Sequence, residues 1–195
     1  MMAKIPGLQG SLLLPFLLLW LGAGGPASAA EIEGVRFQDR LEVRGLELEL
    51  RSVGLLRYRA LFKAYVAALY LDPAGATDAW RGDVPKRLEI EYFWSIRAED
   101  FGPAAELLLA RSLAPSVLAG LREPLERLHA RYEDVRPGDR YALTYLPGRG
   151  TELAKNGESL VVVPGADFAS AYFGIWLGAD PIDRALRDQL LARHE

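Results

Sequence analysis

The sequence contains no cysteine, which excludes disulfide bonds, thiolate nucleophiles and cysteine-ligated metal centres. Histidine is almost as scarce, because His129 and His194 are the only two in 195 residues. Neither histidine has a second histidine at a metal-ligand spacing, so we interpret both as surface residues. The sequence therefore predicts no metal site.

Motifs for cofactor binding and nucleophilic catalysis are also missing. The chain has no GxGxxG and no GxxxxGK[ST] segment, and none of its serines lies in a GxSxG motif. The acidic pairs Glu47/Glu49 and Glu89/Glu91 alternate with apolar residues, which is typical of solvated strand faces rather than of acid–base pairs. We therefore predict no cofactor and no catalytic residue.

Positive charge is in slight deficit. The chain has 23 Lys and Arg against 26 Asp and Glu, a formal net charge of −3. Nucleic-acid-binding domains usually carry an excess of basic residues that neutralise phosphates. The balance therefore argues against nucleic acid as a partner.

The N-terminus has the pattern of a secretory signal peptide. A short apolar run, residues 12–21, is interrupted by Pro15 and followed by GAGGPASAA, with small residues at Ala27 and Ala29. We expect residues 1–29 to be the signal peptide, with cleavage between Ala29 and Ala30 and delivery to the periplasm or the exterior. An uncleaved anchor is the alternative, but the run is short for a membrane span. After cleavage, no stable membrane span is expected.

Residues 30–195 are expected to form one domain, since the chain shows no repeat and no low-complexity linker. Alternating patterns predict strands, periodic apolar stripes predict helices, and these elements follow in blocks. This order predicts an α+β fold, an antiparallel β-sheet with a layer of helices on one face. The expected strands are 32–37, 41–50, 55–71, 86–94, 140–146, 151–155 and 158–163, and the expected helices are 101–113, 115–132, 167–177 and one starting near 180.

Local signals refine these elements. The change of parity at Arg44-Gly45 predicts a turn or bulge, and Asn156-Gly157 predicts a tight hairpin. Pro124 should kink or restart the helix around it. Asp180 and Pro181 are expected as the N-cap and first residue of the last helix.

The stretch 55–71, interpreted as one strand, has two unlike faces. Its even positions are apolar throughout. Its odd positions carry the cations Arg57, Arg59 and Lys63 in their first half, in phase with Tyr65, and are apolar in their second half. Cations beside a tyrosine hydroxyl and an apolar wall form a plausible clamp for an anion with a hydrophobic body. The alternative is a surface patch or an edge strand whose charges prevent aggregation.

Aromatic residues are further candidates for the walls of a pocket, although most such residues are plain core. Tyr92 is singled out because it lies on an inward face and has a polar tip. The other candidates are Trp94, Tyr141, Tyr145, Tyr172, Phe173 and Trp176.

Two segments, GLLRYRALFKAYVAALYL at 54–71 and FASAYFGIWLGADPIDRALRDQLL at 168–191, resemble the chalcone isomerase-like family in its bacterial exported branch. The resemblance extends over residues 33–191. It implies an antiparallel sheet, helices on one face and a ligand cleft between them. In that family, plant enzymes use an arginine to stabilise a phenolate oxygen, and related plastid proteins bind fatty acids with an arginine and a tyrosine. Arg57 falls near the family arginine, and Tyr65 stands where the enzymes have threonine, which favours the fatty-acid binders.

The leading hypothesis is a non-enzymatic, extracytoplasmic binding protein for a hydrophobic carboxylate such as a fatty acid. Arg57 and Tyr65 would hold the head group, Arg59 or Lys63 would add positive potential, and Tyr92 would line the pocket. The alternative is a chalcone-type isomerase, an intramolecular lyase that stabilises an oxyanion with the same arginine. A third hypothesis is a scaffold that has kept the fold and lost the cleft. The sequence does not predict an oligomeric state.

Overall fold

A seven-stranded antiparallel sheet is the largest element of the computed structural model, which describes residues 29–59 and 61–192. Its strands follow one another in sequence order, so every neighbour is also the next strand along the chain. The strands are β3 (Arg40–Val43), β4 (Leu46–Tyr58), β5 (Phe62–Leu71), β6 (Lys86–Tyr92), β7 (Arg140–Leu146), β8 (Gly150–Lys155) and β9 (Glu158–Val163).

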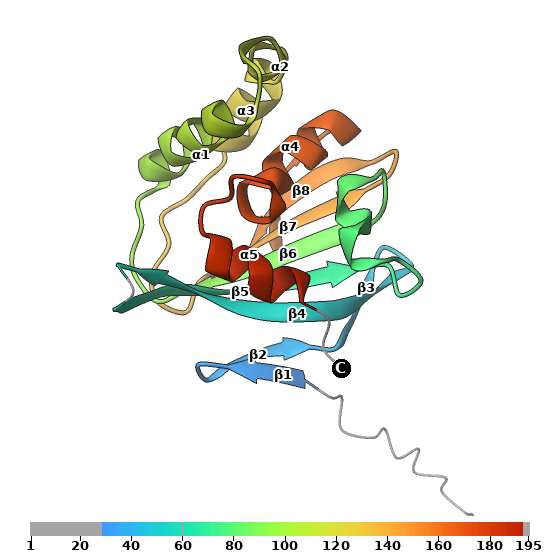
Figure 1. Cartoon of the computed structure of the whole chain (residues 1–195), viewed down its shortest axis with the longest axis vertical. Helices are drawn as coiled ribbons and strands as arrows, with labels where there is room; N and C mark the ends of the chain where they lie inside the picture. The colour runs from blue at the N-terminus through green and yellow to red at the C-terminus, as the bar shows by residue number, and fades with distance from the viewer. Residues whose placement is uncertain (1–28, 60, 193–195) are drawn as a thin grey trace, which may run out of the picture.

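The helices lie on one face of this sheet, and a separate two-stranded hairpin lies on the other (Figure 1). The α+β fold predicted from the sequence is confirmed. The helices are α1 (Ala98–Ser112), α2 (Pro115–Gly120), α3 (Arg122–His129), α4 (Ala166–Leu177), α5 (Arg184–Leu191) and the 3-10 helix η1 (Thr77–Arg81), and the hairpin strands are β1 (Ala29–Ile32) and β2 (Val35–Gln38).

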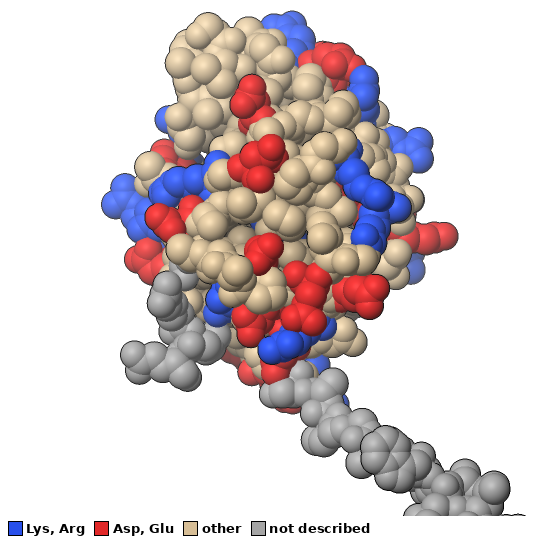
Figure 2. Space-filling model, turned by 90° about the vertical axis from the view of Figure 1, so that its right-hand side faces the viewer, with Lys and Arg blue, Asp and Glu red and all other residues tan. Residues whose placement is uncertain are grey.

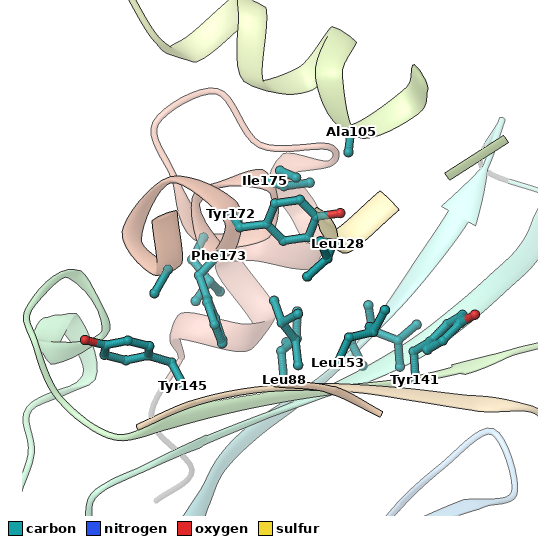
Figure 3. Packing of buried hydrophobic residues seen from close by; sticks show 14 of the residues in the cluster. Leu88, Ala105, Leu128, Tyr141, Tyr145, Leu153, Tyr172, Phe173 and Ile175 are labelled. Carbon is teal, nitrogen blue, oxygen red and sulfur yellow. The ribbon is translucent and has the colours of Figure 1, made fainter. Parts of the chain in front are cut away.

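The sheet separates two apolar clusters. Between the sheet and α4, side chains such as Leu88 and Leu153 point toward Tyr172 and Ile175 (Figure 3). On the opposite face, a smaller cluster packs against the β1–β2 hairpin, and its fully buried members include Phe37. The middle of the sheet is thus covered on both sides.

Strand β5 contributes to both clusters by alternation. Ala67 and Leu69 face the helices, whereas Val66 and Ala68 face the β1–β2 hairpin. All four are 0 % exposed. A strand buried on both faces reads as a continuous apolar run, which explains the long hydrophobic stretch in the sequence.

Two predicted turns are confirmed. Arg44 and Gly45 join β3 to β4 with φ of 52° and 81°, and Asn156 and Gly157 join β8 to β9 with φ of 50° and 87°. Positive φ at both central residues is the geometry that matches the twist of a two-residue hairpin.

The prediction of single strands at 32–37 and 55–71 is wrong, because each segment is a hairpin. The first reverses at Glu33 and Gly34, with φ of 52° and 81°, and the second reverses between β4 and β5, where Arg59 has φ of 51°. Arg59 has no adjacent glycine, asparagine or aspartate to signal a turn. The apolar residues around it therefore looked like one continuous strand.

The restart predicted around Pro124 is confirmed: the segment expected as one helix at 115–132 is two helices that meet at Leu121, and Pro124 lies in the first turn of α3, where proline is tolerated. The last helix, in contrast, begins later than expected. Its N-cap is Asp183, not Asp180, since the Asp183 carboxylate accepts a hydrogen bond from the Leu186 amide at 2.7 Å.

The predicted signal peptide lies outside the described residues, apart from Ala29, which opens β1 and pairs with Gln38. Within residues 29–59 and 61–192, no helix is long and apolar enough to cross a bilayer. Figure 2 shows one face with uncharged side chains at its upper left and centre, basic side chains at both sides and several acidic side chains gathered in its lower half.

Candidate ligand-binding cavity

A cavity of about 260 Å³ lies between the helix-facing side of the sheet and helices α1 and α4. Strands β5 to β8 form the sheet side of the cavity, and the segments after α3 and α4 also contribute lining residues. Its lining is almost wholly apolar or aromatic: Tyr65, Leu88, Ile90, Tyr92, Ile96, Asp100, Phe101, Ala104, Ala105, Leu108, Tyr132, Tyr141, Leu143, Leu153, Tyr172, Ile175, Trp176 and Ile182.

The size of the cavity suits a small organic molecule. Small-molecule sites typically measure about 300–1,000 Å³, and this cavity lies slightly below that range. An engineered apolar cavity of about 150 Å³ binds benzene. By proportion, the enclosed part of this cavity holds roughly ten non-hydrogen atoms. Asp100, Ala104 and Ile182 are exposed, and they mark its opening to solvent.

Antiparallel pairing places Tyr65 of β5 opposite Tyr92 of β6. Directly opposite residues project from the same face of a sheet, so both rings point toward the helices. Their centroids are 5.7 Å apart, and Tyr92 also lies 6.1 Å from the ring of Tyr141. Phe101 of α1 stacks on Tyr132 at 4.6 Å. The rings form a continuous aromatic wall.

The tyrosine hydroxyl groups of this wall differ in how many hydrogen bonds they make. Tyr65 accepts a hydrogen bond from Trp176 Nε1 at 3.0 Å, and the hydroxyls of Tyr132 and Tyr172 bond to each other at 2.8 Å. The Tyr141 hydroxyl is fully engaged, because it donates to the Glu133 carbonyl and accepts from the Glu133 amide.

The Tyr92 hydroxyl has no hydrogen-bond partner within the described part of the chain. Three hydroxyl protons therefore have no acceptor within that part of the chain. They are those of Tyr92 and Tyr65 and one of the two protons of the Tyr132–Tyr172 pair. The cavity thus offers neutral donors to an oxygen atom of a ligand.

These phenols stay protonated at physiological pH. Burial, the largest cause in each case, raises the pKa of Tyr65, Tyr92, Tyr132 and Tyr172 well above the usual value of 10. Neighbouring hydroxyls add to the rise at Tyr92, and Asp183 adds to it at Tyr65. The cavity therefore has no phenolate to act as a base near neutral pH.

Arg57 and Lys63 lie away from the cavity, which corrects the expected common face with Tyr65. Both cations pair with Glu33 in the β1–β2 turn, on the opposite side of the sheet, with Arg57 at 3.5 Å. The cause is a bulge: Leu56 pairs with Tyr65 but Arg57 pairs with Lys63, which leaves Ala64 as an extra residue in β5. An extra residue reverses the alternation of side chains across it.

Arg59 also lies outside the cavity. It is exposed in the β4–β5 turn, with its guanidinium 5.3 Å from the centroid of the Tyr58 ring. Of the five predicted ligand-binding residues, the structure brings only Tyr65 and Tyr92 together at the cavity. No Lys or Arg occurs among the described residues that line it, and its one charged lining residue is Asp100.

Other lining residues were only partly foreseen. Tyr141, Tyr172 and Trp176 were among the aromatic candidates and line the cavity, whereas Trp94, Tyr145 and Phe173 do not. Tyr132 and Phe101 had no signal beyond their places on predicted apolar helix stripes. Within the described residues, no three Asp, Glu or His side chains come together as a metal site.

The family model for chalcone isomerase-like proteins matches residues 29–192. The chain belongs to the chalcone isomerase-like family. Among solved structures, a fatty-acid binding protein of Arabidopsis thaliana superposes with a TM-score of 0.64 at 14% identity, over 84% of this chain and 96% of that one. At this identity the likeness shows the shared fold. No curated protein matches the sequence.

Proposed function

We propose that this chain is a non-enzymatic, extracytoplasmic binding protein for a hydrophobic carboxylate such as a fatty acid. The observation that carries the proposal is the apolar cavity between sheet and helices, in which the hydroxyl protons of Tyr65 and Tyr92 have no acceptor among the described residues. An apolar body packs against the aliphatic and aromatic lining, and a polar head group bonds to the hydroxyls. Each buried methylene adds about 0.8 kcal/mol to such binding.

The fold likeness supports a ligand of this class, since the superposed Arabidopsis protein is named as a fatty-acid binder. The enclosed volume favours a chain of roughly ten carbon atoms, with longer chains extending through the opening at Ala104 and Ile182. The extracytoplasmic part of the proposal, and the assignment to a bacterial exported branch, depend on the signal-peptide pattern of residues 1–29.

A chalcone-type isomerase has less support. That reaction would need a group to stabilise a developing negative charge on oxygen. The arginine expected for this role, Arg57, pairs with Glu33 on the other face of the sheet. The described residues that line the cavity provide neutral tyrosine hydroxyls instead of an arginine.

The proposal is tested by native mass spectrometry of the full chain expressed with its own N-terminus and purified from the extracytoplasmic fraction. We expect a bound mass in the range of a carboxylic acid, and a higher melting temperature when decanoic acid is added. Recovery only from the cytoplasm would contradict the extracytoplasmic part. A protein without bound mass and without a thermal shift would contradict ligand binding.

Enzymatic activity is tested separately by following the absorbance of a chalcone. We expect no turnover above the spontaneous rate. Turnover that disappears in Tyr92→Phe would instead support the isomerase.

A further inference from the structure

The described residues that line the cavity include no Lys or Arg to balance an ionised head group. The one acidic or basic side chain among its described lining residues is Asp100, which pairs with Arg97 at 3.3 Å, and the carboxylate of Asp183 acts on Tyr65. Burying a carboxylate without a cation is costly, and the negative charge of Asp183 raises that cost further.

The hydrogen-bonding groups suit a neutral oxygen instead. Tyr65 and Tyr92 each have a free proton to donate to a carbonyl or hydroxyl oxygen, and a phenol oxygen can accept a proton from a ligand hydroxyl. A protonated carboxyl group and an alcohol can each both donate and accept, so either can satisfy this wall. A carboxylate can only accept.

We propose that the cavity takes its ligand in uncharged form, so that a bound fatty acid keeps its carboxyl proton and a fatty alcohol of the same length binds in the same place. This inference rests on the proposed function, because it specifies the chemical class of the ligand for the same cavity. It assigns the ligand class to neutral, oxygen-bearing hydrophobic molecules, of which a carboxylic acid is one member.

The titratable groups around the cavity do not reverse this argument. The titratable groups around the cavity are Tyr65 on β5, Tyr92 on β6, Tyr141 on β7, Tyr172 on α4, Tyr132 after α3, Asp100 on α1 with its partner Arg97, and Asp183 before α5. Behind Tyr132 and Tyr172 lies His129, with its ring centroid 6.2 and 6.1 Å from theirs and its Nδ1 3.5 Å from Glu106. The His129 side chain is only 12 % exposed, which corrects its interpretation as a surface residue, and burial lowers its pKa, so this ring is neutral near pH 7.

The pH dependence of affinity distinguishes the two forms of the ligand. If only the protonated acid binds, the measured Kd should rise about tenfold for each pH unit above the pKa of the free acid. Between pH 6 and pH 8 the Kd of decanoic acid should therefore rise about 100-fold. The Kd of 1-decanol, which does not ionise, should change less than twofold over the same range.

The experiment is a titration of the purified full chain with decanoic acid and with 1-decanol at pH 5.5, 6, 7 and 8, below the aggregation threshold of each. 1-Decanol is the matched control, since it reports any change of the protein itself, including titration of His129. A decanoate Kd that stays constant or falls with pH would overturn the inference, as would failure of 1-decanol to bind where decanoic acid binds. If neither compound binds at pH 5.5, the proposed function itself fails.

Discussion

The hydroxyl of Tyr65 accepts a 3.0 Å hydrogen bond from the indole nitrogen of Trp176, and this bond links the sheet side of the cavity to its helix side. Tyr65 belongs to β5 and Trp176 to α4, 111 residues further along the chain. The bond uses an oxygen lone pair of Tyr65 and leaves its proton free. Tyr65 thus combines a structural contact with a proton available to the proposed ligand on one hydroxyl, whereas the Tyr92 hydroxyl has no partner in the described chain.

This difference predicts unequal effects on stability for two matched substitutions. Tyr65→Phe should lower the free energy of unfolding by about 1–2 kcal/mol, because the Trp176 donor loses its acceptor. Tyr92→Phe should change stability by less than about 0.5 kcal/mol but weaken 1-decanol binding by about 1 kcal/mol, or roughly fivefold in Kd. Urea unfolding and titration of both variants check this. Equal loss of stability in the two variants would contradict the assigned difference.

Removal of the predicted arginine clamp should leave ligand binding intact. Arg57→Ala breaks an ion pair with Glu33 on the far face of the sheet, and an exposed pair of this kind contributes about 0–1 kcal/mol. We expect the Kd for decanoic acid at pH 6 to stay within twofold of the wild type. Arg59→Ala, in the exposed turn, is the matched control. A tenfold weaker Kd in Arg57→Ala alone would show that the head group reaches this guanidinium.

The sequence predicted the fold better than the site, and residues 55–71 show why. Patterns of apolar residues report which segments are buried, and so the sheet, most of its strands and the helix layer were predictable. The side of the sheet to which a residue points depends on parity, and one extra residue at Ala64 reverses it. Neither this bulge nor the turn at Arg59 has a glycine or proline to announce it.

Long-range packing also explains why the aromatic wall was only half predicted. Tyr132 and Tyr172 meet through contacts between segments 40 residues apart, which periodicity cannot show. Tyr92 was selected for its inward face and polar tip, and that reasoning holds because β6 is regular along its length. Local patterns identify cavity residues where the backbone is regular and fail where it is not.

Lys86 gives a prediction for the pH dependence of stability. Its side chain is buried, its Nζ donates to the Gly82 carbonyl at 2.7 Å, and it lies over the ring of Tyr145. Burial lowers its pKa from 10.5 to about 8, an effect that Asp83 partly opposes. Between about pH 8 and 10.5 the unfolded chain therefore binds more protons at this lysine than the folded chain, so the contribution of Lys86 to stability increases with pH.

The comparison with Lys86→Met isolates this contribution, because other groups titrate alike in both proteins. The free energy of unfolding of the wild type relative to the variant should stay constant below about pH 7 and rise between pH 8 and pH 10. Urea unfolding of both proteins at pH 7, 8, 9 and 10 provides the measurement. A difference that is flat, or that falls with pH, would mean that the lysine keeps its ordinary pKa in the fold.

Gly54 allows α5 to approach β4 closely, and a larger residue there should destabilise the fold. A Cβ at this position would lie 2.7 Å from Leu186 Cδ1 and 3.2 Å from Gln189 Cβ. Gln189 also accepts hydrogen bonds from the Leu55 amide and from Ser52, so a displaced α5 would lose these bonds as well. We expect Gly54→Val to lower the free energy of unfolding by about 1–3 kcal/mol, the usual cost of overpacking.

Gly120 provides the matched control for this prediction. It ends α2, and a Cβ there would meet no atom within 4 Å. Gly120→Ala should leave stability unchanged or raise it by up to about 1 kcal/mol, because it restricts the unfolded chain. Urea unfolding of the two variants compares them directly. If Gly54→Val were as stable as Gly120→Ala, the close approach of α5 to β4 would not limit the size of the residue at position 54.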